Sequence, residues 1–168
     1  MKVVIVGCGR TGAMLAEVLD ATGHEVLIMD VRSSAFARLP HSFKGEAVRG
    51  DGTDEGILRR AGATGADVFL TLTEGDNRNI MAAQLARESL GAGRVFAKVN
   101  DPVRAQAYAE LGIGTVCRTT MITDVLLGAI GEPATGTPSL FDGQGYDRGG
   151  GSPLAAATPG RPAAPREG

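Results

Sequence analysis

The sequence predicts an α/β fold built on a doubly wound parallel sheet of six strands. An apolar run at residues 3–6 feeds directly into the turn Gly7-x-Gly9-x-x-Gly12, and helix-forming residues follow at once. A carboxylate, Asp30, closes the next apolar run. Strand and helix patterns then alternate along residues 1–131. Together these observations are typical of a Rossmann-like fold that binds a nucleotide.

Each glycine of the turn has its own role. Gly7 permits the tight turn, Gly9 lets the backbone approach a pyrophosphate, and Gly12 lets the helix pack closely on the strand. The start of that helix offers unpaired N–H groups and a partial positive charge to phosphates. Asp30 is placed to accept hydrogen bonds from a ribose diol, and its charge disfavours a 2′-phosphate. Arg32 stands beside it and is able to offset that repulsion.

The remaining elements follow in order, with turn and cap residues at several junctions. Strands are expected at residues 2–6, 25–30, 46–49, 67–72, 94–99 and 115–117. Helices are expected at residues 11–22, 33–39, 54–61, 76–90, 102–111 and 119–130. Gly23 and Gly91 end helices, Pro102 opens one, and the expected N-caps are Asp54, Asp76 and Asp101. The first, second and fourth strands are nearly continuous apolar runs, which predicts helices on both faces of the sheet.

Composition changes near Gly131. Six of the eight prolines lie from Pro133 onward, among Gly, Ala, Ser and Thr. Such a segment buries too little apolar surface to offset the entropy of ordering it. We therefore predict one nucleotide-binding domain at residues 1–131 and a disordered tail at residues 132–168. The few apolar residues of the tail, Leu140, Phe141 and Tyr146, are interpreted as scatter in a linker.

Bulk composition excludes several classes of function. The 168 residues carry a net charge of −2, so no overall basic field favours nucleic acid. Cys8 and Cys117 lie far apart and are expected to be reduced thiols of a cytoplasmic protein. No apolar stretch is long enough to cross a bilayer. Because the first strand is expected to begin at residue 2, we expect no signal peptide. Any association with a membrane is therefore expected to come through a partner.

Polar residues at other strand ends are expected to gather around the same cleft. Arg10 opposes the helix dipole, which favours a phosphate contact over a simple exposed charge. The loop 50–54 is equally well read as a capped turn or as an adenine contact. Lys98 either reaches a phosphate or extends into solvent. The candidate ligand-binding residues are Gly7, Gly9, Arg10, Thr11, Gly12, Asp30, Val31, Arg32, Asp51, Gly52, Thr53, Thr73, Asp76, Asn79 and Lys98.

No pattern for catalysis accompanies this cleft. His24 and His41 stand in turn-like contexts, without a nucleophile or a metal-ligand spacing beside them. A dehydrogenase also needs a substrate pocket and a proton donor, and the six strand–helix units leave no residues to build them. We therefore expect a protein that is not an enzyme and holds no metal. An NAD-dependent oxidoreductase of Rossmann type is the alternative.

Several short segments carry a family resemblance across about residues 1–130. They are Val4–Gly12, Gly23–Val26 leading to Asp30, Gly50–Thr53, Ala66–Thr73, Asp76–Asn79, Ala97–Pro102 and Leu111–Ile113. In this order and spacing the chain resembles the N-terminal nucleotide-binding domain of Trk/Ktr-type potassium-uptake regulatory subunits, the RCK, KTN or TrkA-N family. The resemblance implies a non-enzymatic protein that binds NAD(H) or ATP/ADP. It also implies a role in gating a membrane potassium-translocating subunit from the cytoplasmic side of the membrane.

The resemblance also implies roles for individual residues. The glycine turn and Arg10 would hold phosphates, Asp30 the ribose, and Asp51 and Thr53 the adenine. The phosphate side would include Thr73, Asp76, Asn79 and Lys98. The helix at 119–130 would pair subunits into a homodimer or a larger ring, with or without a paralogous regulator. Its apolar face comprises Met121, Ile122, Val125, Leu126 and Ile130.

The chain departs from the family pattern in two respects. Family members usually carry a second ligand-sensing domain after this point, whereas here we expect only the polar tail after Gly131. The segment Cys117–Thr120 lacks the acidic residue that some relatives use for metal coordination, so metal-linked ATP sensing is not expected. A nucleotide-binding module of another transporter, such as an antiporter, is a third hypothesis.

Overall fold

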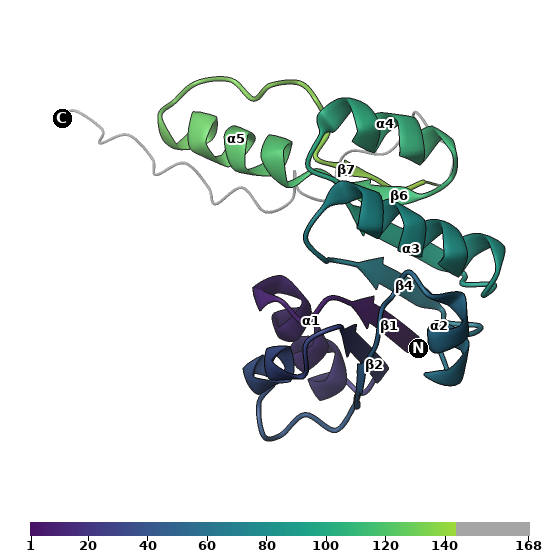
Figure 1. The fold of residues 1–168 in the computed structure, drawn as a ribbon. Coiled ribbons are helices and arrows are strands. Elements are labelled where there is room, and N and C mark those ends of the chain that lie inside the picture. The colour runs from purple at the N-terminus through teal and green to yellow at the C-terminus, as the bar shows by residue number, and fades with distance from the viewer. Residues whose placement is uncertain (144–168) are drawn as a thin grey trace.

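The computed structural model describes residues 1–143, which form a seven-stranded sheet flanked by helices (Figure 1). The strands are β1 (Lys2–Val6), β2 (Glu25–Asp30), β3 (Glu46–Arg49), β4 (Val68–Thr71), β5 (Arg94–Lys98), β6 (Gly114–Val116) and β7 (Leu140–Phe141). The helices are α1 (Arg10–Ala21), α2 (Glu55–Arg60), α3 (Asp76–Glu88), α4 (Pro102–Glu110) and α5 (Arg118–Ala129), with a 3₁₀ helix η1 (Ser33–Arg38). None of these helices is long and apolar enough to cross a membrane.

The strand order is β3-β2-β1-β4-β5-β6-β7. All neighbouring strands from β3 to β6 are parallel. The chain therefore winds outward from β1 through β2 to β3, then crosses back to β4 and winds outward in the other direction. The loops after β1 and β4 consequently diverge and leave a crevice between them. The predicted doubly wound α/β fold is confirmed, with one more strand than expected.

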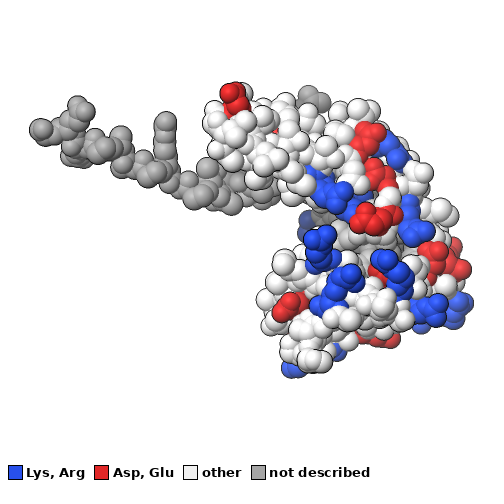
Figure 2. Space-filling view, turned by 60° about the vertical axis from the view of Figure 1, so that its left-hand side comes forward, with Lys and Arg blue, Asp and Glu red and all other residues white. Residues whose placement is uncertain are grey.

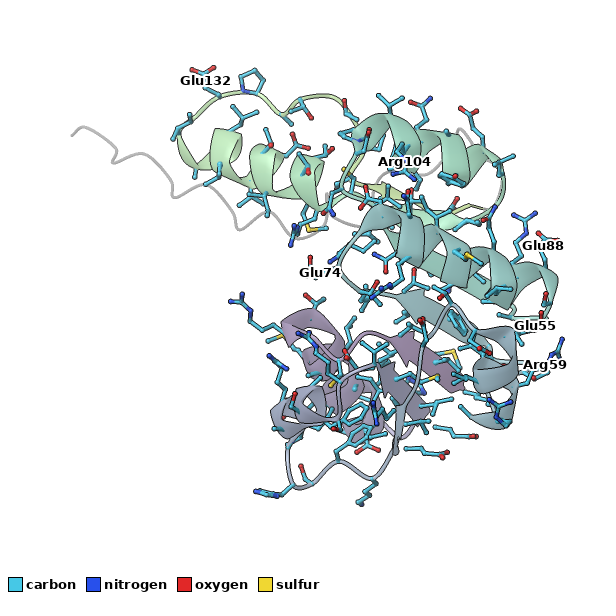
Figure 3. The ribbon with its side chains drawn as sticks, viewed as in Figure 1. Glu55, Arg59, Glu74, Glu88, Arg104 and Glu132 are labelled. Atoms are coloured by element: carbon cyan, nitrogen blue, oxygen red, sulfur yellow. The ribbon has the colours of Figure 1, made fainter. Side chains whose placement is uncertain are left out.

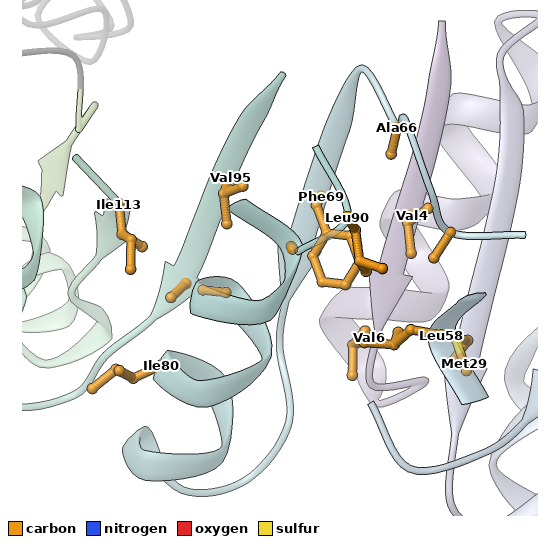
Figure 4. Close-up of a cluster of buried hydrophobic side chains, with 14 of the residues drawn as sticks. Val4, Val6, Met29, Leu58, Ala66, Phe69, Ile80, Leu90, Val95 and Ile113 are labelled. Carbon is orange, nitrogen blue, oxygen red and sulfur yellow. The ribbon is translucent and has the colours of Figure 1, made fainter. Parts of the chain in front are cut away.

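Apolar residues cover both faces of the central strands. Successive residues of a strand point to opposite faces, so Val3 and Ile5 pack with α1 and η1 while Val4 and Val6 pack on the other face. That second cluster includes residues of α2, α3 and α4 around the fully buried Phe69 (Figure 4). Burial on both faces explains the uninterrupted apolar runs of β1 and β2.

Two of the three expected N-caps are confirmed. Asp54 accepts a hydrogen bond from the Ile57 N–H at 2.9 Å, and Asp101 accepts one from the Val103 N–H at 2.9 Å. Asp76 is not a cap, because α3 begins at Asp76 itself and Gly75 precedes it with a φ of 92°. The helix expected at 33–39 is the short 3₁₀ helix η1, and Pro40 follows it closely.

A seventh strand lies inside the segment that the sequence predicts to be disordered. Leu140 and Phe141 pair antiparallel with β6, and the Cys117 N–H donates to the Ser139 carbonyl at 2.7 Å. The expectations of six strands and of disorder at residues 140–141 are therefore wrong. A two-residue strand has no periodicity to read, and its pairing partner lies more than 20 residues away along the chain. The rest of the predicted tail, residues 144–168 including Tyr146, lies outside the described residues.

Strand β7 predicts a measurable contribution to stability. A chain ending at residue 143 should be more stable than one ending at residue 131 by about 1–2 kcal/mol, since the shorter chain loses the β6–β7 hydrogen bonds and the packing of Phe141. Urea denaturation of the two truncated chains measures the difference. The Phe141→Ala variant of the longer chain should lose part of this stability difference. Equal midpoints for both chains would show that β7 does not stabilise the sheet.

Helix α5 extends away from the sheet (Figure 1). Thr120 in its first turn is buried, whereas Val125, Leu126 and Ile130 expose 60–74% of their surface. Ile122 is 49% exposed. An apolar helix face that is open to solvent is typical of a protein–protein contact. Pairing of subunits through α5 stays a prediction.

Candidate functional site

A cleft opens at the carboxyl ends of β1, β2 and β4, where the winding direction of the sheet reverses. Its volume is about 370 Å³, which is in the range of small-molecule sites. The residues that line it are Val6, Gly7, Gly9, Met29, Asp30, Val31, Arg32, Gly50, Asp51, Gly52, Leu72, Thr73, Glu74 and Arg78. They come from both windings of the sheet, as the fold class predicts.

The three glycines of the first turn are needed for different reasons. Gly7 has a φ of 110°, and a Cβ there would meet the Thr73 nitrogen at 2.9 Å. A Cβ on Gly12 would lie only 2.0 Å from the Gly7 carbonyl oxygen. Among residues 1–143, no atom lies within 4 Å of a Cβ built on Gly9. Gly7 and Gly12 thus hold the turn against its neighbours, while Gly9 presents bare backbone to the open cleft.

Asp30 ties the glycine turn to the end of β2. Its Oδ2 accepts a hydrogen bond from the Cys8 N–H and its Oδ1 accepts one from the Arg32 N–H, both at 2.9 Å. A carboxylate offers about four acceptor positions, so two remain for hydroxyl donors of a ligand. Burial, and then the Asp30 charge, raise the pKa of the Cys8 thiol, which is consistent with an unreactive buried cysteine.

Asp51 lines the cleft from the loop after β3. Its Oδ1 accepts hydrogen bonds from the Thr53 N–H at 2.9 Å and the Thr53 hydroxyl at 2.8 Å. These two bonds, together with the positive charge of Arg78, outweigh partial burial and lower the pKa of Asp51. The carboxylate is therefore ionised at neutral pH. Thr53 supports Asp51 and does not itself line the cleft.

Asn79 joins the ends of β4 and β5. Its Oδ1 accepts from the Thr73 N–H at 2.8 Å and the Thr73 hydroxyl at 2.7 Å. Its Nδ2 donates to the Thr73 carbonyl at 3.0 Å and the Lys98 carbonyl at 2.9 Å. The side chain is fully buried, so its polar atoms are all used within the protein. Asn79 thereby fixes Thr73 at the edge of the cleft.

Asp76 performs a similar task for the next loop. It accepts hydrogen bonds from the Asn100 N–H at 3.0 Å, the Asn100 Nδ2 at 2.9 Å and the Asp101 N–H at 3.2 Å. Burial acts to raise the pKa of Asp76, but these hydrogen bonds and the charge of Arg104 outweigh it, and the net pKa is lowered. Asp76 therefore anchors the β5–α4 loop and lies outside the cleft lining.

This arrangement predicts a pH-dependent contribution of Asp76 to stability. A lowered pKa in the folded state means that the stabilisation is present above the ordinary Asp pKa of about 3.9 and is lost as the pH falls through the folded-state value. The free energy of unfolding of the Asp76→Asn variant should be lower by about 1 kcal/mol at pH 7. The new amide NH₂ group cannot accept a hydrogen bond and would face an N–H donor. Urea denaturation from pH 7 to pH 3 should show this difference narrowing only below about pH 4. A difference that is constant with pH would contradict the role of the charge.

The structure brings eight of the fifteen predicted residues to the cleft lining and leaves seven beside it. The lining includes Gly7, Gly9, Asp30, Val31, Arg32, Asp51, Gly52 and Thr73. The lining does not include Arg10, Thr11, Gly12, Thr53, Asp76, Asn79 and Lys98. Arg10 and Thr11 are exposed at the start of α1, next to the lining residue Gly9. The Lys98 side chain is 13% exposed, and its Nζ lies 3.7 Å from a Glu74 oxygen.

Six lining residues are absent from the sequence prediction. Four are apolar or glycine, namely Val6, Met29, Gly50 and Leu72. They end strands or follow them directly, which is the signal that would have identified them. The other two, Glu74 and Arg78, carry charge and stand in the loop after β4 and in the first turn of α3. Figure 2 shows basic side chains gathered across the middle of one face of the molecule, with acidic side chains among them.

A larger cavity of about 520 Å³ lies at the opposite ends of β5 and β6, where Arg87 and Arg94 line it. The guanidinium groups of these two arginines already have partners within the described residues. Arg87 donates to the Leu111 carbonyl and pairs with Glu88 at 3.0 Å, and Arg94 lies 5.1 Å over the Phe96 ring. Size alone therefore does not identify the functional site, and the cleft at the reversal of the sheet remains the candidate.

Comparison with protein families gives a match to the TrkA-N domain over residues 3–119. The "Trk system potassium uptake protein TrkA" of Streptomyces coelicolor is 44% identical over 127 residues, which cover 76% of this chain and 57% of the relative. A TrkA homolog of Pyrococcus abyssi is 30% identical over 111 residues, which cover 66% of this chain and 49% of the relative. The chain thus spans about half the length of these relatives.

Solved structures share the fold at low sequence identity. The TrkA-N domain of the inner membrane protein ybaL from Escherichia coli has a TM-score of 0.68 at 19% identity, covering 77% of this chain and 96% of that one. The GsuK channel bound to NAD has a TM-score of 0.62 at 20% identity, and the match covers 76% of this chain and 23% of the GsuK chain. GsuK bound to ADP has a TM-score of 0.61 at 20% identity, and the match covers 76% of this chain and 33% of that GsuK chain.

Proposed function

The chain belongs to the TrkA-N domain family, and from this premise we propose that it is a nucleotide-binding regulatory subunit of a potassium uptake system. One observation carries the proposal. The cleft combines a bare glycine backbone at Gly9 with the two remaining acceptor positions of Asp30. A pyrophosphate and a ribose diol of an adenine nucleotide require these two features side by side. The relatives named as potassium uptake proteins supply the biological context.

The proposed ligand is NAD(H) or ATP/ADP. Structures of the GsuK channel with NAD and with ADP support both classes for a fold of this kind. Phosphates would rest on the turn Gly7–Gly12 and the amide end of α1, near Arg10 and Thr11. Asp30 would hold the ribose with Val31 and Arg32 beside it, and the Asp51–Thr53 loop would face the adenine. Thr73 and Lys98 would lie toward the terminal phosphate, positioned from behind by Asp76 and Asn79.

Binding would act by shifting a population of subunit arrangements. A ligand biases an equilibrium only through a difference in affinity for its two states. The proposed states are two arrangements of a homodimer or larger ring joined through the exposed apolar face of α5, alone or with a paralogous regulator. The ring would contact a membrane potassium-translocating subunit at the cytoplasmic face of the membrane. In this scheme the domain at residues 1–131 transmits ligand identity and catalyses no reaction.

Thermal unfolding in the presence of nucleotides tests the proposal. A ligand that binds only the native state raises the unfolding temperature, and the rise grows with the ratio of free ligand to its dissociation constant. We expect NAD⁺, NADH, ATP or ADP at millimolar concentration to stabilise the protein, and GTP to do so less. Absence of stabilisation by all four adenine nucleotides would overturn the proposal. Turnover of NADH with any of a panel of carbonyl substrates would support an oxidoreductase in its place.

A further inference from the structure

We propose that Glu74 makes the cleft selective for a dinucleotide such as NAD(H) over a nucleoside triphosphate. The proposal rests on the nucleotide-binding function above and specifies its ligand class. Glu74 belongs to the loop between β4 and α3 and lines the cleft next to Thr73. Its side chain is 86% exposed and one oxygen lies 3.7 Å from the Nζ of Lys98. Figure 3 shows Glu74 on the loop just before α3, with Glu88 at the opposite end of that helix.

The β4 loop adjoins the part of the cleft where phosphates are expected. A Cβ on Gly7 would meet the Leu72 carbonyl carbon and the Thr73 nitrogen at 2.9 Å, so this loop runs directly beside the glycine turn. The Asp51 loop follows β3, on the opposite side of β1 in the sheet. An adenosine that lies toward β2 and β3 therefore directs whatever follows its pyrophosphate toward Glu74.

Two groups can follow the adenosine phosphates at this position, and they differ in chemistry. The γ-phosphate of ATP is an anion, so it would face the Glu74 carboxylate and would have to displace it from Lys98. The second ribose of NAD(H) carries hydroxyl groups, which donate hydrogen bonds to a carboxylate. One residue thus repels the triphosphate and favours the dinucleotide, and specificity is such a difference between two affinities.

Isothermal titration of the wild-type protein and Glu74→Gln with NAD⁺ and with ATP, in magnesium-free buffer, tests the proposal. Removing one like charge beside the terminal phosphate should tighten ATP binding by about three- to tenfold. NAD⁺ binding should stay equal or weaken by less than about threefold, since a neutral amide still accepts one hydrogen bond. The gain for ATP should shrink as salt is raised from 50 to 500 mM.

Glu88→Gln is the matched control. Glu88 is also an exposed carboxylate that pairs with a cation on α3, but it lies at the far end of that helix (Figure 3). It should leave both affinities unchanged. Equal effects of Glu74→Gln on ATP and NAD⁺, or weaker ATP binding in this variant, would overturn the inference. Failure of the wild-type protein to bind either nucleotide would instead overturn the proposed function.

Discussion

Replacing Gly12 by Ala should destabilise the domain and abolish nucleotide binding together. The added methyl carbon would stand 2.0 Å from the Gly7 carbonyl oxygen, which is backbone and has no rotamer to adopt. Helix α1 must therefore move away from the turn, and overpacking of this kind costs about 1–3 kcal/mol or more. Urea denaturation and NAD⁺ titration of the same preparation measure the two effects.

The Gly9→Ala variant is the matched control for this experiment. A Cβ at Gly9 meets no atom of the described residues within 4 Å, and the backbone there has a φ of −77° that alanine adopts readily. Stability should stay within about 0.5 kcal/mol of the wild type, while the methyl group should obstruct the approach of a pyrophosphate. A Gly9→Ala protein with unchanged nucleotide affinity would show that the phosphates do not rest on this turn.

Removing the Asp30 carboxylate should weaken the binding of all adenine nucleotides by the same factor. The Asp30→Ala variant loses the proposed acceptor of the ribose hydroxyls and leaves the Cys8 N–H without its Asp30 partner. We expect a loss of about 1–3 kcal/mol in binding free energy for NAD⁺, ATP and ADP alike, and a loss of about 1 kcal/mol in stability. Titration calorimetry measures the first effect and urea denaturation the second.

The Asp30→Asn variant separates charge from hydrogen bonding. Its amide oxygen can keep one of the two backbone hydrogen bonds, so it should fall between the wild type and Asp30→Ala in both measurements. The uniform loss expected here also contrasts with Glu74→Gln, which is expected to separate ATP from NAD⁺. Unchanged affinities in Asp30→Ala would rule out its contact with the ribose.

Features encoded within a few residues could be predicted from the sequence. The glycine turn, Asp30 and the caps Asp54 and Asp101 each depend on neighbours close in the chain. The turn follows β1 and Asp30 ends β2, and the carboxyl ends of neighbouring parallel strands meet at one edge of the sheet. That geometry is why the residues predicted after β1, β2, β3 and β4 include eight that line one cleft.

Features that depend on distant segments could not be predicted. Asp76 is a residue type that often caps helices, and it stands where a cap is expected. Its side chain instead accepts a hydrogen bond from Asn100, 24 residues away. Asn79 is predicted to contact the ligand in the cleft. Its side chain is instead buried and donates a hydrogen bond to the Lys98 carbonyl, 19 residues away. Leu140–Phe141 stand in a segment of low apolar content and are ordered by pairing with β6. In each case the deciding energy is a tertiary hydrogen bond, which leaves no local pattern.

A crystal structure of the protein with NAD⁺ would show directly where the nucleotide binds. We expect the adenosine ribose hydroxyls within hydrogen-bond distance of the Asp30 carboxylate, and the pyrophosphate over Gly9 at the start of α1. A nucleotide bound elsewhere on the protein, with this cleft empty, would contradict this expectation.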